Sequence, residues 1–356
     1  MTDKNFIKGG SEHIQALINN AVKNECRTAT VSGNWEIDTA IRLPSNFTLI
    51  LDSCHLRLAD NSFCNIFVND HNETELGKTA TGTDTNISII GRGEAILDGG
   101  NPNGLCEKTP IDERPAPLWK NNLILFTNVR GFKISGIACR NQRWWALNFI
   151  YCSEGYLGNI DFCANDTGID ADGNEYHGLF RKKYSEILVK NADGIDLRQG
   201  CHDIVIENIT GFTEDDTVAL TALDNNMEKF FKVDGLPSDL CNVKISNIRS
   251  ATICSNVRLL NQGEIKLHDI DIDGVYDNSR NSPHISDHGI HAVKLGDTHL
   301  YGKRHSTEDE TYNISIKNVY GAGDAVVSLA GKIKNLVMYG IESGHPKTKL
   351  LDDNRS

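Results

Sequence analysis

One short pattern of hydrophobic and polar positions recurs along the chain. Apolar and polar residues alternate, an Asn, Gly or Asp follows, and a further apolar residue closes the motif. Alternation of this kind is typical of short β-strands with one buried face. The motif occurs at 132–137, 156–160, 204–209, 243–248, 265–270, 314–319 and 336–341.

The closing residues of these motifs lie 22 or 23 residues apart, about twice that far apart, or one period plus an insertion apart. A period in the low twenties predicts a solenoid of stacked β-coils, because one coil cannot bury its own apolar face. Asn and Gly suit the bends, since both tolerate left-handed backbone. The leucine ladder of leucine-rich repeats is absent. We therefore expect an all-β fold, a single-stranded right-handed parallel β-helix.

An amphipathic helix is predicted at 11–24. Its apolar residues share one stripe, and Ser11 is placed to cap its first turn. Such a helix would cover the open edge of the first coil, which otherwise invites strand pairing. The stripe consists of Ile14, Leu17, Ile18 and Val22.

The chain shows no linker or low-complexity tract, so we expect one β-helix domain over residues 1–356. The N-terminal cap would span 1–30 and the coils 31–345. Inserted loops on a solenoid tend to cluster on one face and build the site. Polar composition places such loops at 165–185, 224–239 and 277–311.

Charge and composition narrow the class of partner. The chain carries 36 Lys plus Arg against 48 Asp plus Glu, a net charge of −12 without a basic run, which disfavours nucleic-acid binding. No apolar run approaches the ~18 residues of a membrane span, so we expect no membrane partner. The first residues lack a secretory signal pattern, which predicts a cytoplasmic protein. The oligomeric state stays open.

Two acidic clusters carry the candidate chemistry: Asn191–Asp196, which contains Asp193, and the pair Asp215 and Asp216. Asp193 and Asp215 are 215 − 193 = 22 residues apart, which is one coil, and stacked strands lie about 4.8 Å apart. Crowded carboxylates raise at least one pKa, which supplies an acid beside a base. Glycoside hydrolysis needs that combination. Turn residues and a Ca²⁺ site are the alternative interpretations.

At these residues the chain resembles glycoside hydrolase family 28, the polygalacturonase-like, pectin-degrading enzymes, as a divergent member. The resemblance is clearest over 91–222, where 91–99 looks like the family's glycine-rich lead-in to the helix. Segment 191–196 is similar to the family's Asn-Thr-Asp motif with Ala192 in place of Thr. The pair 215–216 resembles its Asp-Asp motif.

The resemblance implies a pectate-lyase-like solenoid and an inverting hydrolase without a cofactor or metal. Carried over by position, Asp215 would be the general acid. Asp193 and Asp216 would hold and deprotonate the attacking water. The residues expected to bind the oligosaccharide substrate are Trp145, Asp196, His202, Arg258, His291 and Lys294.

Two departures from the family pattern bear on the substrate. The family's Gly-His-Gly motif has its nearest match at 252–256, which lacks His, and its carboxylate-binding Arg-Ile-Lys motif corresponds to 291–295. Lys294 matches the Lys of that motif, but Ala292 stands where Arg would be. A planar guanidinium clamp is not replaced by Lys. Plain polygalacturonate is therefore disfavoured relative to another uronide, a rhamnose-containing pectin fragment or a neutral glycoside.

Other residues leave alternatives open. Arg258, His288 or His291 would be candidates to replace the missing guanidinium. The stretch 165–170 echoes the later acidic motif, but only Asp193 sits one coil before Asp215. Trp144 and Trp145 would face opposite sides of a strand, one in the core and one against a sugar.

Three functions fit the sequence. The leading interpretation is an exo-acting hydrolase of pectin-derived or related oligosaccharides. A uronide lyase on the same solenoid is the second, and a non-catalytic carbohydrate-binding β-helix is the third.

Overall fold

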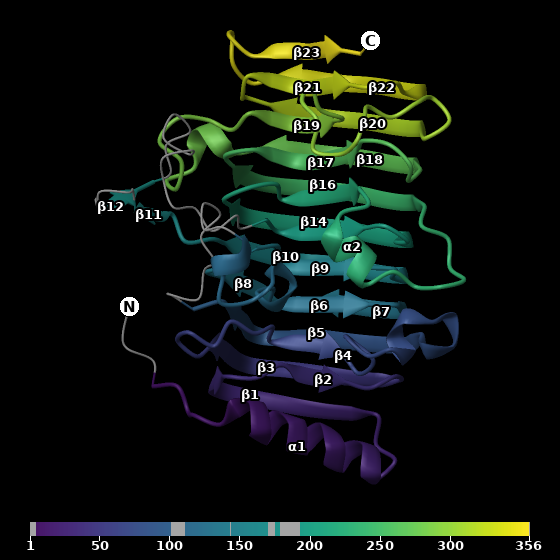
Figure 1. Ribbon diagram of the computed structural model, residues 1–356. Helices are drawn as coiled ribbons and strands as arrows, with labels where there is room; N and C mark the ends of the chain where they lie inside the picture. Colours follow the sequence, from purple (N-terminus) through teal and green to yellow (C-terminus); the bar gives the residue numbers. More distant parts are fainter. Residues whose placement is uncertain (1–4, 101–110, 143, 170–174, 179–192, 356) are drawn as a thin grey trace.

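The computed structural model describes residues 5–100, 111–142, 144–169, 175–178 and 193–355. These residues form a right-handed parallel β-helix of two long sheets, with the chain rising one rung per coil (Figure 1). The first sheet contains β1 (Thr28–Ile37), β3 (Phe47–Leu58), β5 (Asp84–Asp98), β7 (Val129–Ser135), β8 (Ala138–Arg140), β10 (Ser153–Cys163), β14 (His202–Thr213), β16 (Leu240–Thr252), β18 (Leu267–Asp277), β20 (Thr311–Gly321) and β22 (Lys334–Ser343).

The second sheet has shorter strands and follows the order of the chain. It contains β2 (Ile41–Leu43), β4 (Phe67–Asn69), β6 (Ile124–Thr127), β9 (Leu147–Ile150), β13 (Ile195–Arg198), β15 (Val218–Ala222), β17 (Ser255–Asn261), β19 (His291–Leu295), β21 (Ala325–Ala330) and β23 (Lys349–Asn354). The predicted fold class is confirmed.

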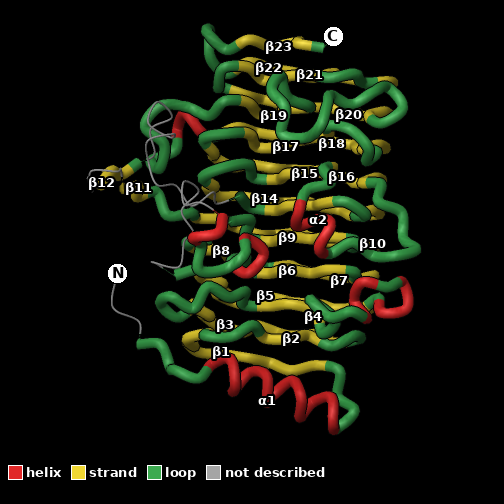
Figure 2. The backbone as a smooth tube through the Cα atoms, in the orientation of Figure 1, coloured by secondary structure: helices red, strands yellow, loops and turns green. Residues whose placement is uncertain are grey.

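Helices lie outside the coils, as the red segments of Figure 2 show. The longest is α1 (Gly10–Lys23), which lies below β1 and β2 and covers the end of the solenoid (Figure 1). Ile14 and Ile18 are fully buried, as the stripe predicted. The remaining helices are η1 (Leu76–Lys78), η2 (Ala80–Gly82), η3 (Ile111–Glu113), η4 (Leu118–Lys120), α2 (Asn226–Phe230) and η6 (Ser279–Asn281).

The predicted role of Ser11 is wrong. Gly9 is the N-cap of α1, with a left-handed φ of 77° that suits glycine. The Ser11 hydroxyl instead accepts hydrogen bonds from the backbone N–H groups of Asp38 and Thr39. It therefore ties the helix to the end of β1.

The closing apolar residues of the repeat stack inside the solenoid. Ile160, Ile209 and Ile248 are register partners in β10, β14 and β16, and each is at most 1% exposed. The residue that continues this row in β18 is Val275 rather than Ile270. The motif at 265–270 belongs to a second bend of the same strands, which has the same local pattern.

Left-handed residues make both bends. At the first bend, which directly precedes the buried row of Ile160, Ile209 and Ile248, the left-handed residues are Asn159, Asn208 and Asn247. Their φ values are 55°, 57° and 51°. Their side-chain amides form a ladder, with Nδ2 of Asn208 donating to Asn159 at 3.2 Å and Nδ2 of Asn247 donating to Asn208 at 2.6 Å. At the second bend, Asp269 and Asn313 have φ values of 56° and 55°. Asn and Asp tolerate this conformation better than other side chains with a Cβ.

The expected loop boundaries need two corrections. Segment 277–311 is not one loop, because β19 lies inside it and pairs with β17 and β21. The coils also continue past residue 345, since β23 pairs with β21. Within 165–185, β11 (Thr167–Ile169) and β12 (Glu175–His177) form an antiparallel hairpin beside the solenoid (Figure 1).

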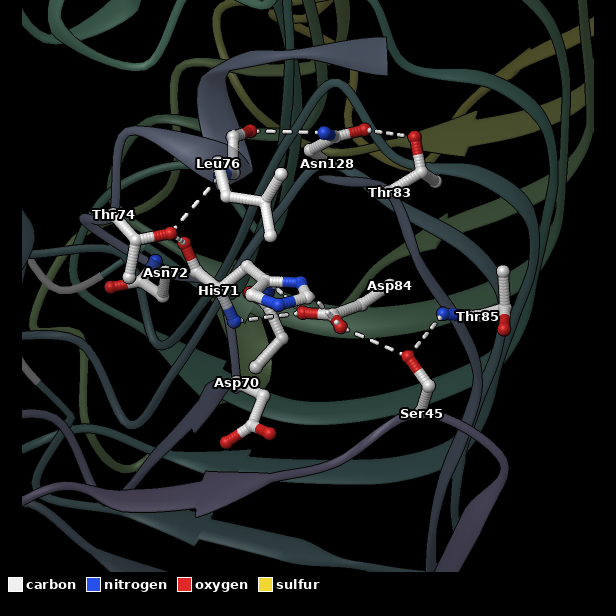
Figure 3. Close-up of polar contacts among 12 residues, drawn as sticks. Ser45, Asp70, His71, Asn72, Thr74, Leu76, Thr83, Asp84, Thr85 and Asn128 are labelled. Atoms are coloured by element: carbon white, nitrogen blue, oxygen red, sulfur yellow. Dashed lines mark hydrogen bonds and ion pairs between the residues drawn. The ribbon is translucent and has the colours of Figure 1, made fainter. Parts of the chain in front are cut away.

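A buried aspartate organises one corner of the solenoid (Figure 3). Asp84, 1% exposed, accepts hydrogen bonds from the Ser45 hydroxyl at 2.9 Å, the Asn69 amide at 2.8 Å and the His71 backbone N–H at 2.9 Å. Ser45 contacts Asp84 and not the imidazole of His71, so these side chains do not form a nucleophile–base pair. The cluster joins the ends of β2 and β4 to the start of β5.

Candidate active site

The acidic clusters meet at the edge of the second sheet where its strands begin. Ile195 of β13 pairs with Val218 of β15, which pairs with Val257 of β17. Two residues before each of these positions, the chain places Asp193, Asp216 and Ser255 in one row. The rung partner of Asp193 is therefore Asp216, 23 residues on, and Asp215 lies one residue ahead of that row.

Asp193 is 5% exposed and sits among other carboxyl groups. Burial raises the pKa of Asp193 well above its ordinary range, and the charges of Asp215, Asp196 and Asp216 raise it further. The side chains of Asp193 and Asp196 also share a hydrogen bond. Four carboxyl groups thus crowd together, and neighbouring like charges disfavour the ionised form of such groups.

The turn that carries Asp215 and Asp216 is held from two rungs. Hydroxyls of Thr213 and Thr252 both donate to the backbone carbonyl of Asp215, the first at 2.8 Å. The backbone N–H of Ser255 donates to Oδ1 of Asp216 at 2.9 Å. Both residues are half-buried. These hydrogen bonds therefore fix the position of the turn that carries the two carboxyl groups.

Asp216 has a pKa suited to proton transfer near neutrality. Burial and the charge of Asp215 raise the pKa of Asp216 to about 7, while the cations Arg258 and Lys294 oppose the rise. A carboxyl group with this pKa exchanges its proton in the pH range where most enzymes work.

Asp196, which was expected to bind the substrate, is buried beside an arginine. It is 1% exposed, and its Oδ1 pairs with the guanidinium of Arg198 at 3.1 Å. Arg198 also pairs with Glu228 of α2 at 2.8 Å, and its Nε donates to Asn148 at 3.1 Å. Burial raises the pKa of Asp196 to about 7, with Arg198 opposing. Asp196 therefore links the acidic cluster, through its hydrogen bond with Asp193, to the buried guanidinium of Arg198.

The two tryptophans are not in a strand. Trp144 and Trp145 have left-handed φ values of 33° and 63°, so the alternation argument does not apply to them. Trp144 is 4% exposed, and Trp145 is half-buried. The guanidinium carbon of Arg198 lies 3.9 Å from the Trp145 ring centroid. That contact covers one face of the ring that was expected to stack on a sugar.

Arg258 and Lys294 are register partners on adjacent rungs, and both reach Asp297. The N–O distances are 2.7 Å from Arg258 and 2.9 Å from Lys294. Burial opposes ionisation of Asp297, but its bonds to these two cations hold its pKa below the ordinary value. Two cations share one carboxylate here, which leaves one positive charge beside Asp216.

Two residues of this region escaped the sequence reasoning. The Cys254 thiol hydrogen-bonds to Asp215, and burial together with the carboxyl charges raises the thiol's pKa. Cys254 occupies the segment where the family pattern has its His. Tyr301, 55% exposed, lies over Arg258 at 5.9 Å. Burial of its hydroxyl raises the pKa of Tyr301 to about 12, and the charges of Asp297, Asp215 and Asp216 contribute.

The two predicted histidines lie outside the acidic cluster. His291 is the rung partner of Ser255, and burial and Lys294 lower its pKa to about 4, so it is neutral at pH 7. His202 starts β14 in the other sheet, where it bonds to Asp203 and lines a separate pocket. His202, which was expected to bind the substrate, is therefore separated from the acidic cluster, because the chain runs through the whole of β13 and into the first sheet before it reaches this residue.

The acidic stretch 165–170, which resembles the motif at 191–196, also lies outside the acidic cluster in its described part. Asp166 pairs with His284 at 3.0 Å, at the start of the β11–β12 hairpin. Asp193 instead lies beside Asp215 and Asp216, although its rung partner is Asp216 and not Asp215, the residue that the 22-residue spacing indicated. Asp170 lies outside the described residues.

A pocket of about 550 Å³ lies beside α2, and Arg198, the partner of Asp196, is one of its walls, whereas Asp193, Asp215 and Asp216 are not among its lining residues. Trp145, Arg198, Glu228 and Tyr301 line it, together with polar residues of the loops that follow β15, β17 and β19. Its size and mixture of aromatic and polar walls are typical of small-molecule sites. The predicted loops 224–239 and 277–311 contribute to it.

Neither a metal cluster nor a membrane helix occurs in the part of the chain that the structure describes. There, no group of three or more His, Cys, Asp or Glu side chains is placed to hold a metal ion. No helix of those residues is long and apolar enough to cross a membrane.

Comparison with known proteins identifies the fold but not the family. No protein-family model matches the chain, and no curated protein matches it in sequence. Among solved structures, the family 82 iota-carrageenase of A. fortis aligns with a TM-score of 0.60 at 12% identity, covering 99% of this chain and 88% of that one. The polygalacturonase of Erwinia carotovora aligns at 0.54 and 14%, covering 99% and 95%.

A third structure, the exopolygalacturonase of Thermotoga maritima, aligns with a TM-score of 0.51 at 13% identity, covering 97% of this chain and 88% of that one. The chain therefore shares its β-helix fold with glycoside hydrolases. Identities this low leave activity to be argued from the site.

Proposed function

We propose that this protein is an inverting, exo-acting glycoside hydrolase of pectin-derived or related oligosaccharides, a divergent relative of family 28. The observation that carries the proposal is the meeting of Asp193, Asp215 and Asp216 at one edge of the sheet. Burial and mutual repulsion keep at least one proton in this cluster near neutral pH. Hydrolysis with inversion needs one protonated and one ionised carboxyl group on either side of the bond.

The roles are those that the resemblance to family 28 implies for these positions. Asp215 is partly exposed, precedes the row of Asp193 and Asp216, and donates the proton to the leaving oxygen. Asp193 and Asp216 lie on adjacent rungs, about 4.8 Å apart along the solenoid, and hold the attacking water. The proton that the water loses passes to this pair, and the pair returns it to Asp215 through solvent. No covalent sugar intermediate forms.

The charge beside the cluster supports an acidic sugar at the cleaved bond. Arg258 brings a guanidinium to the rung before Lys294, so the missing Arg at position 292 is supplied from a neighbouring strand. Its Nε is buried and has no hydrogen-bond partner among the described residues. A planar guanidinium is suited to carboxylate recognition.

Replacement of Asp215 by Asn tests the proposal. Turnover of oligogalacturonides, rhamnogalacturonan fragments and neutral glycosides is measured side by side, with Asp309→Asn as a control at an exposed surface site. We expect Asp215→Asn to abolish turnover of whichever substrate the native chain cleaves, with an unchanged circular dichroism spectrum. Persistent turnover would show that the proposed acid is wrong.

The products distinguish the alternatives. Hydrolysis yields saturated sugars with inverted configuration, whereas a lyase yields an unsaturated product that absorbs in the ultraviolet. Exo action releases one short product from the start, and a mixed ladder of early products from a long polymer would contradict it. Binding without any product would favour a carbohydrate-binding protein.

A further inference from the structure

The two ends of the solenoid are covered differently. At one end α1 lies against the first coil, and Leu17, Ala21 and Val22 pack on the core (Figure 1). At the other end β22 and β23 form the last rung, and each of them has a paired strand on only one side among the described residues. The outer edge of this rung therefore presents main-chain N–H and C=O groups that can pair with a further strand.

The core is partly open at the β22 end. Ile314 and Ile316 of β20 are 1% and 0% exposed. Their register partners in β22 are Leu336 and Met338, which are only half-buried although they continue the same inward-facing rows. Apolar surface of the last rung is thus left in contact with water, and its burial by another element would stabilise the solenoid.

The outward positions of β22 differ from those of the coils before it. Val337 and Tyr339 are each 54% exposed. At the same two positions the preceding strands carry polar residues, which are Ser315 and Lys317 in β20 and Asp271 and Asp273 in β18. Segment 336–341 therefore contains no charged residue. Native sheet edges are usually protected from pairing by charges, so this edge is suited to pairing.

Charges of opposite sign flank the uncharged segment. Lys334 begins β22 and Glu342 lies near its end, and both are exposed. Within the described ranges neither forms an ion pair, whereas Lys317 on the rung before pairs with Asp271 at 2.7 Å. A strand with a cation at one end and an anion at the other is complementary to a second copy of itself in the antiparallel orientation, because each cation then meets an anion.

The pleat of the strand limits the register of such a pair. Residues directly opposite each other in an antiparallel pair point to the same face, so the inward positions of one copy must meet inward positions of the other. A two-fold axis through Met338 meets this condition. It places Val337 opposite the partner's Tyr339, and the symmetry repeats this contact. An aromatic residue opposite a β-branched one is a favourable cross-strand pair.

The same axis also brings the flanking charges together. Lys334 and Glu342 are equally far from Met338 along the strand, so each Lys334 lies opposite the partner's Glu342. Opposite charges at facing positions stabilise a strand pair, and like charges there destabilise it. One register thus satisfies the pleat, the apolar pair and the charge pair together.

We propose that β22 pairs with β22 of a second copy of this chain, antiparallel about a two-fold axis at Met338, and that the last rungs of the two solenoids form an end-to-end dimer interface. Both copies contribute the same surface to a two-fold contact, so the assembly closes at two chains. The contact pairs the free edges and covers Leu336 and Met338. It requires no catalytic activity, so it can be tested independently of turnover.

Sedimentation velocity of the full chain over a wide range of protein concentration measures this association. We expect a species with twice the mass of one chain that dissociates on dilution. The mass of a single chain at every concentration would overturn the proposal. Growth into larger assemblies would also overturn it, because a two-fold contact cannot propagate.

Exchange of the flanking charges tests the register. Glu342→Lys gives two Lys–Lys contacts in its dimer, and Lys334→Glu gives two Glu–Glu contacts, so each variant is expected to associate about tenfold more weakly than the native chain. An equimolar mixture of the two variants restores both opposite-charge pairs and is expected to dimerise as tightly as the native chain. A mixture that associates no better than either variant alone would overturn this register. Glu308→Lys, with the same change of charge at an exposed site, is the matched control and keeps native affinity.

An apolar variant tests the contact independently of charge. Tyr339→Ser removes both aromatic contacts with the partner's Val337 and is expected to weaken dimerisation about threefold to tenfold. Ile7→Ser, at a residue 55% exposed near the opposite end of the solenoid, is the matched control. Both side chains are exposed, and an unchanged circular dichroism spectrum shows that the variants fold. Equal affinities of the two variants would contradict the interface at β22.

Discussion

The backbone N–H of Ser255 donates a 2.9 Å hydrogen bond to Oδ1 of Asp216 across two neighbouring rungs. The main chain of one coil therefore holds a carboxyl group of the coil before it. The neighbouring carboxyl group of Asp215 bonds to the Cys254 thiol of the same segment. The start of β17 and the residue before it thus support both acidic residues of the turn.

The raised pKa of Asp216 predicts how stability depends on pH. Its pKa is about 7 in the folded chain, against an ordinary value of 3.8, so the folded state binds its proton more tightly than the unfolded state does. The contribution of Asp216 to the free energy of unfolding is therefore constant and fully present below about pH 4. It is lost as pH rises from 4 towards 7. Asp216→Asn is expected to reduce the fall in Tm between pH 4 and 7.

The control for this effect is Asp309→Asn, at an exposed site. Thermal unfolding is followed by circular dichroism at intervals of half a pH unit. A pH dependence that is the same in the native chain and Asp216→Asn would contradict the raised pKa.

Arg198 is predicted to be needed for stability. Arg198→Met leaves Asp196 and Glu228, each 1% exposed, without their shared cation. Loss of one partner from a buried ion pair typically costs about 3–5 kcal/mol of unfolding free energy. Urea unfolding measures the loss. Lys229 lies next to Glu228 in α2 and forms a surface ion pair with Asp224 at 3.8 Å. Lys229→Gln is the control and is expected to change the free energy of unfolding little.

A combined variant distinguishes charge from packing at Arg198. Glu228→Gln with Asp196→Asn removes both carboxylates. If the loss in Arg198→Met comes from unpaired charge, adding these two changes restores part of it. No recovery would mean that the contact with Trp145 accounts for the loss.

Asp84 is predicted to stabilise the corner shown in Figure 3. Asp84→Asn replaces one of the two carboxylate oxygens by an NH₂ group, which then faces either the Ser45 hydroxyl or the N–H groups of Asn69 and His71. Each buried donor left unsatisfied costs about 1–3 kcal/mol. Asp60→Asn, whose carboxylate pairs with Arg57 at the surface, is the control and is expected to cost less than about 1 kcal/mol. Equal unfolding midpoints in urea for the two variants would contradict this role of Asp84.

Arg258 is predicted to select for a charged sugar. Arg258→Lys keeps the charge beside Asp216 and Asp297 but loses the planar fork. We expect KM for an acidic substrate to rise about tenfold while that for a neutral substrate changes little. The prediction is checked by measuring KM in steady-state kinetics with one acidic and one neutral substrate. A parallel change for both substrates would assign Arg258 a structural role.

Local sequence patterns were sufficient for much of the fold and part of the site. The apolar row through Ile160, Ile209 and Ile248 could be predicted because each coil repeats the same buried positions. The approach of Asp193 to the Asp215–Asp216 pair followed from the coil length. The position of Arg198 beside Asp196 could also have been predicted from the sequence, because alternation in a strand puts residues two apart on the same face.

Other features depend on insertions whose length and shape the repeat does not encode. Ile270 was assigned to the wrong row because the two bends of each long strand share one local pattern. Tyr301 approaches the cluster from a loop and Glu228 from α2, and both lie in insertions where the repeat specifies no position.

The sequence by itself determined the solenoid, its bends and the one-coil spacing of the aspartates, because these are local properties repeated at fixed intervals. Only the tertiary structure decided that Asp196 is buried beside Arg198, that His202 lies in the other sheet, and that burial raises the pKa values of Asp193, Asp196 and Asp216. Burial and charge proximity arise between rungs and loops far apart in the chain, and a pKa depends on that whole environment.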